Sequence, residues 1–478
     1  MQMQNYPGEL NDGEISAIFC GAGDFVRREI CCGKQKLYSY WVDGLVSGGD
    51  ISDYVLKPIC QNVFGDSMKV LYEEALHGVV YNAVANVCED LDDVALKLVN
   101  GFCIVLFSGV GAIAYEVKTG EKRSLSAPEV ENTVKGPKDA FVETIRTNTS
   151  LIRRHLRSPD LRLYETRVGR RTMTNVSVVY LEGITSQTLV EKMTSRLDEI
   201  DVDGFLFPSA VEEYITGSRA TAFPLLQYTE RTDRFCQGLL DGRIGLIVDG
   251  IPLGYLAPVN IGYLMDSPED RSRDYISASC VRILRYLALW ASLLLPALYT
   301  AFIGHHLNWI SCTMRELVLN SREGVPFSPG GEVLSLLIAY ELLQESGIHL
   351  PQAIGQSVST IGGIVVGTAA VEAGLISPIV LIIVSIAGVC GFVLPNRDLA
   401  NGIRVWRFGI AVLSAWLGMW GVAVGMVLLV IHLHKLRSMG TAYLRFSTAR
   451  NKGILRPRLN RMKYRDMALD PEDSKNQK

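Results

Sequence analysis

The longest uncharged apolar stretches of this chain lie in its second half. Residues 283–434 contain six arginines, seven acidic residues and no lysine, whereas charged residues are frequent before and after this region. Four stretches within it have lengths close to that of a membrane-spanning helix, at 286–304, 353–371, 378–394 and 408–434. The pattern predicts an α-helical transmembrane bundle over residues 275–436, followed by a basic tail at 437–478.

The four predicted spans differ in length, and a further helical pattern lies between the first two. Because 378–394 is short for a span and 408–434 is longer than needed, we expect tilt, a kink at glycines or a helix boundary displaced by a few residues. The further pattern, at 331–346, is too short and too charged to cross comfortably, so we predict an interfacial or re-entrant helix there. Its acidic residues are Glu332, Glu341 and Glu345.

The placement of basic residues predicts the orientation of the chain in a membrane. The tail from Lys435 onward holds twelve basic and four acidic residues. The first 20 residues have neither the basic region nor the apolar run of a secretory signal peptide. We therefore expect both ends in the cytosol, an even number of crossings, and residues 305–351 mostly on the far side. The arginines that precede the first span are Arg271, Arg273, Arg282 and Arg285.

Two pairs of segments in the first half of the chain resemble each other. YSYWVDGLVSGGDISDYVL and SVVYLEGITSQTLVEKMTSRL each place an apolar strand before a turn glycine, Gly44 or Gly183, and a helical pattern after it. LVNGFCIVLFSGVGAIAYEV and LLDGRIGLIVDGIPLGYLAPV each contain two glycines eight positions apart, which predicts a tight hairpin. We therefore expect a cytoplasmic α/β half with two similar subdomains, at 36–145 and 146–274, after an N-terminal extension at 1–35.

The connection between the two predicted subdomains is basic. Residues 146–175 contain eight arginines against two acidic residues. One interpretation is a solvated or salt-bridged face between the subdomains, and another is a contact between subunits. Nucleic acid is not expected as a partner, because the net charge of the chain is −3 and no binding motif is present. The candidate subunit-contact residues are Arg153, Arg154, Arg170 and Arg171.

The sequence of this connector and of the membrane half resembles one known family. VKGPKDAFVETIRTNTSLIRRHLRSPDLRLYETRVGRRTMTNVSVVYLEGI is similar to the central signature of the A subunits of GerA-type spore germination proteins. SREGVPF, YELLQESGIHLPQAIGQSVSTIGGIVVGTAAVEAGLISP, VLPNRDLANGIRVWRFG and HLHKLRSMGTAYL follow in the order of the family. The stretch FSPGGEV and the tail after Arg445 depart from the family pattern.

The resemblance implies a protein of the spore inner membrane that acts in a receptor for nutrients. Its expected partners are a transporter-like B subunit, which carries the germinant site, and a lipoprotein C subunit. The resemblance also implies that the A subunit forms a homo-oligomeric channel in membrane lipid and releases monovalent cations when a nutrient is sensed. Two alternatives stay open, which are a spore-maturation paralogue that acts as an accessory ion channel, and a non-conducting scaffold. The sequence does not identify the germinant.

The second predicted span carries small residues at a four-residue spacing. This spacing keeps them near one face of a helix, where they allow close helix packing or line a polar path. Glu372 directly follows this apolar run, where a carboxylate is costly unless it is wet, paired or protonated. We weigh a cap at the cytoplasmic interface against an acid in the ion path. The candidate pore or packing residues are Gly355, Ser359, Gly362, Gly363, Gly367, Thr368 and Glu372.

Motifs of enzymes and of cofactor sites are missing from the sequence. GGIVVGTAA lacks the lysine of a phosphate-binding loop, and GQSVST is not a nucleophile elbow. His305 and His306 have no carboxylate or cysteine at ligand spacing, so we expect no catalytic residue, no metal and no cofactor. The ten cysteines lack C-x-x-C spacing, which in the cytosol indicates free thiols.

Overall fold

The computed structural model describes residues 6–33, 35–61, 67–80, 82, 84–118, 128, 131, 136–204, 207–217, 221–349 and 367–444. They form two compact units. The first unit, here called the α/β unit, contains the described residues up to Gly217 together with Leu226–Pro258. The second, here called the helical unit, contains residues 221–225 and the described residues from Val259 onward.

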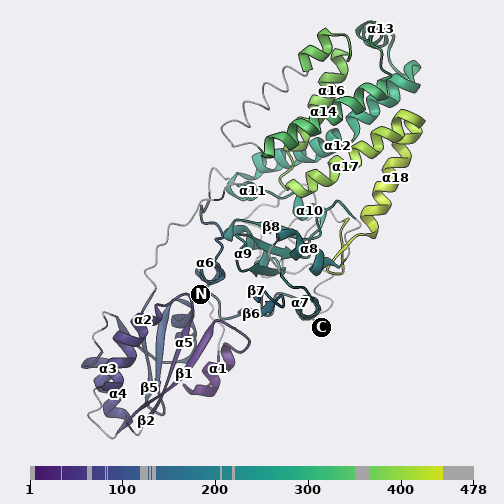
Figure 1. Ribbon diagram of the computed structural model, residues 1–478. Coiled ribbons are helices and arrows are strands. Elements are labelled where there is room, and N and C mark those ends of the chain that lie inside the picture. Colours follow the sequence, from purple (N-terminus) through teal and green to yellow (C-terminus); the bar gives the residue numbers. More distant parts are fainter. Residues whose placement is uncertain are drawn as a thin grey trace. The chain divides into compact units, whose positions relative to one another are not determined.

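A five-stranded antiparallel sheet forms the centre of the first subdomain of the α/β unit (Figure 1). Its strand order is β1-β2-β4-β5-β3. Alternate residues of β4 point to opposite faces of the sheet, as the two-residue period of a strand requires. Both faces are apolar, because helices cover both. The strands are β1 (Phe25–Cys32), β2 (Gln35–Val42), β3 (Ala85–Cys88), β4 (Phe102–Phe107) and β5 (Gly111–Glu116).

Two separate apolar clusters pack on the two faces of this sheet. On one face, Ile104 and Leu106 of β4 pack with α1 and α5. On the other face, Val105 and Phe107 pack with η1, α3 and α4. The subdomain is therefore a three-layer α/β/α structure. The helices are α1 (Asp12–Ile18), α2 (Gly48–Asp50), η1 (Ile51–Leu56), α3 (Lys57–Gln61), α4 (Met68–His77) and α5 (Leu91–Val99).

The second subdomain repeats the topology of the first. Its sheet has the order β6-β7-β9-β10-β8, which corresponds strand by strand to the first sheet. Phe235 of α9 lies directly over Gly245 and Gly254, where no side chain larger than hydrogen fits beneath its ring. The elements are α6 (Ile145–His155), β6 (Leu161–Val168), β7 (Thr174–Leu181), α7 (Gln187–Asp198), α8 (Pro208–Thr216), β8 (Gln227–Thr229), α9 (Thr232–Leu240), β9 (Ile244–Val248) and β10 (Gly254–Ala257).

The predicted duplication is confirmed by the backbone of the paired glycines. In the hairpins β4–β5 and β9–β10, Gly109 and Gly250 have φ of 74° and 83°. Positive φ of this size favours glycine, which is why the same residue recurs in both copies. Gly44 and Gly183 also match, with φ of 83° and 75°.

The first sheet begins earlier in the chain than we predicted. We assigned residues 1–35 to an extension, but α1 and β1 belong to the first subdomain. β1 pairs with β2 over eight residues, from Phe25 opposite Val42 to Cys32 opposite Gln35. It is one of the two edge strands of the sheet, and its sequence, FVRREICC, lacks a regular alternation of apolar and polar residues, so the pattern did not predict a strand.

In the described residues of the helical unit, five helices are longer than a dozen residues, and short elements accompany them (Figure 1). α12 packs against α14, α16, α17 and α18. The elements are α10 (Ile261–Leu264), α11 (Glu269–Ser272), α12 (Tyr275–His305), η2 (Leu307–Trp309), α13 (Cys312–Ser321), α14 (Pro329–His349), α16 (Pro378–Phe392), α17 (Arg397–Leu417), α18 (Met419–Lys435), β11 (Arg437–Ser438) and β12 (Thr441–Ala442).

The apolar segment 408–434 is two helices instead of the one continuous helix that we predicted. α17 ends at Leu417 and α18 begins at Met419, and Gly418 between them has a φ of 59°. Gly421 and Gly425 then let α18 approach α17 closely, since a Cβ on Gly425 would lie 2.9 Å from Ile410. The glycines therefore produce a reversal of direction where we expected at most a kink.

The other predicted spans differ in how far the structure describes them. Among the described residues, only α12 is long and apolar enough to cross a membrane by length and composition, while α16 and α18 are shorter apolar helices. Most of the predicted span 353–371 lies outside the described residues. The segment 331–346 lies within α14, where Val333 and Leu337 are buried in a core shared with α12 and α16.

Candidate functional site

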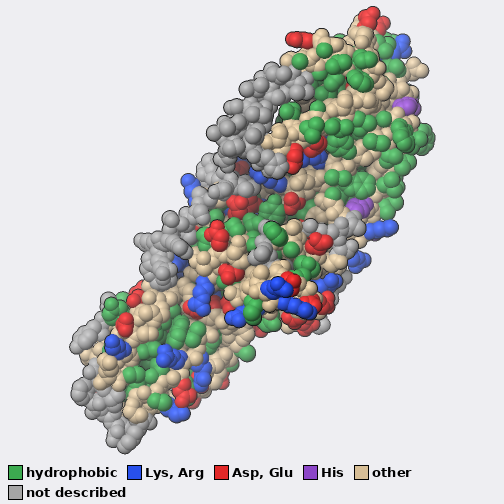
Figure 2. Space-filling view, viewed as in Figure 1, with side chains coloured by type: hydrophobic (Ala, Val, Ile, Leu, Met, Phe, Trp, Pro, Cys, Tyr) green, Lys and Arg blue, Asp and Glu red, His purple; other side chains and the backbone are tan. Residues whose placement is uncertain are grey.

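Large apolar side chains are exposed over several helices of the helical unit. Trp416 and Trp420, next to the reversal between α17 and α18, are 78% and 76% exposed. Figure 2 shows hydrophobic side chains gathered over the region of α17 and α18. An exposed apolar surface of this kind is typical of contact with lipid or with another protein chain. Further exposed residues are Leu284, Leu287 and Trp290 of α12, Ile382, Ile386, Val389 and Phe392 of α16, and Val424, Val427, Leu428 and Ile431 of α18.

Beneath this surface, Glu332 of α14 is a fully buried carboxylate. Its Oε1 lies 2.8 Å from Nη2 of Arg322, which follows α13. Its Oε2 accepts a hydrogen bond of 3.0 Å from the backbone N–H of Ser377, just before α16. Since a buried charge is costly without such partners, Glu332 fixes the ends of three helices relative to one another.

A second buried charge cluster joins α14 to α17. Glu341 accepts a hydrogen bond of 2.9 Å from Arg407, and its other carboxylate oxygen lies 3.1 Å from Arg404. The Arg407 side chain is 3% exposed. Two of the three glutamates that led us to predict an interfacial helix are therefore neutralised by ion pairs inside the helical unit.

The arginines at the start of α12 are also paired within the chain. Arg282 lies 2.8 Å from Asp266, and Arg285 forms an ion pair with Asp270. Both arginines are nearly fully buried. We count them among the basic residues that orient the chain, and because this rule counts arginine and lysine and gives acidic residues little weight, the pairing leaves that expectation unchanged.

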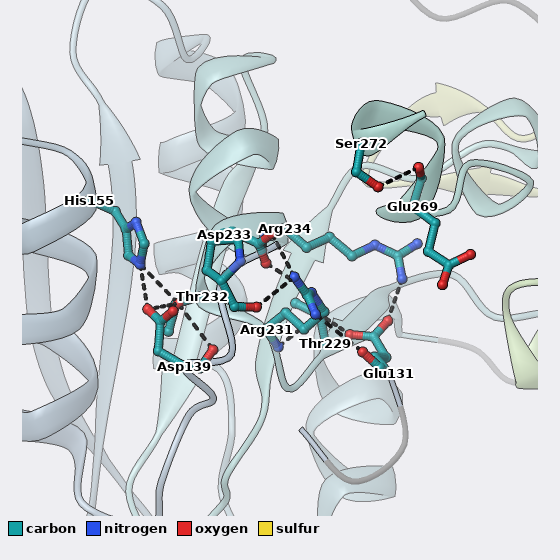
Figure 3. A network of polar contacts seen from close by, with 11 residues as sticks. Glu131, Asp139, His155, Thr229, Arg231, Thr232, Asp233, Arg234, Glu269 and Ser272 are labelled. Atoms are coloured by element: carbon teal, nitrogen blue, oxygen red, sulfur yellow. Dashed lines mark hydrogen bonds and ion pairs between the residues drawn. The ribbon is translucent and has the colours of Figure 1, made fainter. Parts of the chain in front are cut away.

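The α/β unit contains a polar network around the start of α9 (Figure 3). Asp139 accepts hydrogen bonds from His155 of α6 and from the buried hydroxyl of Thr232, at 2.5 and 2.7 Å. Burial raises the pKa of Asp139, but the hydrogen bonds from His155 and Thr232 outweigh it, so the pKa is lowered overall. Because the Thr232 side chain is fully buried, the contacts of Asp139 with His155 and Thr232 attach α6 to the start of α9.

Arg231 forms the other half of this network. Its guanidinium pairs with Asp233 at 2.8 Å and donates to the carbonyl of Pro137 at 3.0 Å. Arg234 forms an ion pair with Glu131. The described residues just before α6 are thereby attached to α9, and a backbone hydrogen bond from Phe141 to Glu230 extends this attachment.

Arg170 and Arg171, two of the four candidate subunit-contact arginines, are exposed. Arg170 forms an exposed ion pair with Asp201, and Arg171 lies near Asp203. Arg154 is also exposed. Arg153, in contrast, is 1% exposed and paired with Asp24, so the structure removes it from the set of candidate contacts. Its burial agrees with our other interpretation, a salt-bridged face between subdomains.

The predicted pore or packing residues lie partly outside the described part of the chain. Gly355, Ser359, Gly362 and Gly363 are among the residues that the structure does not describe. At Gly367, an added Cβ would lie 3.4 Å from Leu381 of α16, so the helix end there contacts α16. Thr368 and Glu372 are exposed and four positions apart in the helical stretch 367–372, which places them on the same side.

Comparison with known proteins identifies the family. The family profile of the Bacillus/Clostridium GerA spore germination protein matches residues 14–472. The chain belongs to the GerA spore germination family. Our expectation from the sequence motifs is therefore confirmed.

Several GerA family relatives match over most of their length. Spore germination protein B1 of Bacillus subtilis is 31% identical over 447 residues, which cover 92% of each chain. Spore germination protein KA of the same species is 31% identical and covers 91% of this chain and 80% of its own. A Bacillus subtilis protein described as uncharacterized membrane protein YfkQ is 33% identical, with coverage of 89% and 83%.

One solved structure also belongs to a GerA family member. It is the N-terminal domain of the A subunit of the Bacillus megaterium spore germinant receptor GerK3. It is 26% identical, has a TM-score of 0.41, and the match covers 54% of this chain and 98% of that chain.

Sequence reasoning missed several residues that matter in this GerA family chain. Arg404 and Arg407 lie three positions apart on α17. Two arginines at this spacing in an apolar helix indicate that a buried acidic residue pairs with them. Gly421 and Gly425 carry the same four-residue spacing that we noted in the second span. Asp24 had no such signal, because its partner Arg153 is 129 residues away.

Proposed function

We propose that this chain is the A subunit of a spore germinant receptor and that its helical unit crosses the spore inner membrane. In this proposal the chain assembles into a homo-oligomeric channel that releases monovalent cations after a nutrient is sensed. A transporter-like B subunit supplies the germinant site, and a lipoprotein C subunit completes the receptor. The α/β unit and the C-terminal tail lie in the cytosol.

The observation that carries this proposal is the exposed apolar surface of the helical unit in a chain of the GerA family. The exposed positions include aromatic side chains of α17 and α18 and aliphatic side chains of α12 and α16. In water this surface is costly at about 25 cal/mol per Å², whereas lipid or neighbouring subunits remove that cost. Family membership supports the role in germination.

The buried ion pairs of the helical unit support a membrane location. Glu332 with Arg322, and Glu341 with Arg404 and Arg407, place opposite charges within hydrogen-bonding distance. Charged residues inside a membrane protein are expected to pair with one another or to face a water-filled path. These five side chains follow the first of these rules, and the exposed Glu372 is our candidate for the second.

The proposed cation path uses the helix that ends at residue 372. Thr368 and Glu372 present a hydroxyl and a carboxylate on one exposed side of its last turns. Oxygen atoms of this kind replace part of the water shell of a cation, and a ring of carboxylates from several subunits favours cations over anions. Gly367 packs against Leu381 of α16 within the chain. The predicted role of Gly355, Ser359, Gly362 and Gly363 in close packing between subunits concerns residues outside the described part of the chain.

The release of potassium from spores tests the receptor role. Spores that lack this chain, and spores that carry it restored, are exposed separately to a panel of nutrients. The proposal predicts that loss of the chain abolishes potassium release to at least one nutrient and that restoration recovers it. If spores that lack the chain release potassium normally for every nutrient but mature abnormally, the chain is instead a spore-maturation paralogue.

A further inference from the structure

Two cysteine side chains of the first subdomain lie against each other. The sulfur atoms of Cys32, at the end of β1, and Cys60, in α3, are 3.0 Å apart. Cys32 is 1% exposed, whereas Cys60 is half-buried. The two residues are 28 positions apart in the sequence, so the fold alone brings them together.

The neighbouring cysteines differ from this pair in position. Cys31 precedes Cys32 on β1, and because side chains alternate along a strand it points to the other face and is exposed. Cys103 belongs to the same apolar cluster as Cys32 but is fully buried. Burial raises the pKa of both Cys32 and Cys103 to about 12, so neither thiol reacts readily by itself with an external reagent.

We propose that Cys32 and Cys60 form a reversible disulfide by exchange with a low-molecular-weight disulfide. The half-buried Cys60 thiol loses its proton, and its sulfur attacks the external disulfide, which forms a mixed disulfide and releases one small thiol. The Cys32 sulfur then attacks the Cys60 sulfur and releases the second small thiol. The two protein thiols are oxidised, the external disulfide is reduced, and the two protons leave on the two small thiols.

The location of the pair gives the disulfide a structural effect. α3 and η1 cover one face of the first sheet, and the disulfide joins α3 to the edge strand β1. It closes a loop that contains β2, α2 and η1, and this lowers the conformational entropy of the unfolded chain. In a reducing cytosol both residues remain thiols. The disulfide therefore forms only when the concentration of low-molecular-weight disulfides rises.

Peptide mapping of the full-length protein tests this proposal. The reduced protein in detergent is incubated with oxidised glutathione, digested with trypsin without reduction, and analysed by mass spectrometry. We expect a cross-link between the peptide that contains Cys32 and the peptide that contains Cys60. The same cross-link persists in Cys31→Ser and is absent in Cys60→Ser and in Cys32→Ala.

A second measurement, thermal unfolding before and after oxidation, tests the proposal in the wild-type protein and so does not depend on whether the variants fold. Oxidation raises the thermal unfolding temperature of the wild-type protein and of Cys31→Ser, and dithiothreitol reverses the increase. Cys60→Ser shows no increase on oxidation. Glutathione bound to Cys60 without an intramolecular cross-link, or a cross-link that uses Cys31, would overturn the proposal.

Discussion

Arg153 of α6 and Asp24, which precedes β1, form a two-pronged ion pair that is shielded from solvent. Nε of Arg153 donates a hydrogen bond of 2.7 Å to Oδ2 of Asp24, and Nη2 donates one of 2.7 Å to Oδ1. The side chains are 1% and 5% exposed. The pair links the second subdomain to the first, next to a backbone hydrogen bond of 2.7 Å from Gly23 to Leu163.

Removal of one partner of this pair is expected to destabilise the α/β unit strongly. Asp24→Asn leaves the guanidinium of Arg153 buried without a countercharge, and a loss of this kind costs about 3–5 kcal/mol. The neighbouring exposed Arg154→Ala serves as the control and changes stability by less than about 0.5 kcal/mol. Urea unfolding of a soluble fragment that ends near residue 258 measures both values, and equal effects would contradict the role of the ion pair.

The same fragment tests how Asp139 responds to acid. Because the pKa of Asp139 is lowered in the folded state, its stabilising contribution is present above its unfolded pKa of about 3.9 and is lost as pH falls through the lower folded value. Asp139→Asn therefore destabilises at pH 7, and its difference from wild type shrinks as pH falls below about 4. Asp198→Asn, at an exposed residue of α7, serves as the control variant, and a pH-independent difference for Asp139→Asn would exclude this explanation.

The sequence predicted those parts of the fold that depend on local requirements. Turn glycines such as Gly109 and Gly250 revealed the duplication, because each turn needs a positive φ in both copies. The apolar stretches predicted helices for the same reason, since composition and length are local properties. Strand β1 was missed because an edge strand half exposed to solvent carries a weak pattern.

The candidate site was less predictable than the fold. The sequence alone does not distinguish the three acidic residues in or beside apolar segments, Glu332, Glu341 and Glu372. The structure shows that Glu332 and Glu341 form ion pairs, whereas Glu372 is exposed. Arg153 looked like its exposed neighbour Arg154 in the sequence. Ion pairing between residues far apart in the chain is a property of the tertiary fold, so a local pattern does not reveal it.

The close approach of α17 and α18 depends on Gly421. A Cβ at this position would overlap the carbonyl oxygen of Leu413, whereas a Cβ at Gly409 of α17 would meet nothing within 4 Å. Gly421→Ala is therefore expected to lower stability by about 1–3 kcal/mol, and Gly409→Ala to be neutral or slightly stabilising. Thermal unfolding in detergent distinguishes the two, and equal tolerance would contradict the packing of this helix pair.

Native cysteines report the proposed orientation of the chain. Cys31 in the α/β unit and Cys312 in α13 are both exposed. With both ends in the cytosol and α13 on the far side, a membrane-impermeant maleimide added to intact protoplasts labels Cys312 and spares Cys31. Permeabilised protoplasts provide the control in which both react. Labelling of Cys31 in intact cells would contradict the proposed topology.

Cation flux through the chain in liposomes, together with the proposed B and C subunits and the nutrient that they sense, tests the central claim that it forms a channel. We expect the wild-type protein to carry rubidium ions across the membrane, with cations preferred over chloride. Glu372→Gln lowers this flux and the preference for cations severalfold, while the matched exposed variant Glu323→Gln leaves both unchanged. Absence of flux from a folded, oligomeric wild-type protein would contradict the channel and identify the chain as a non-conducting scaffold.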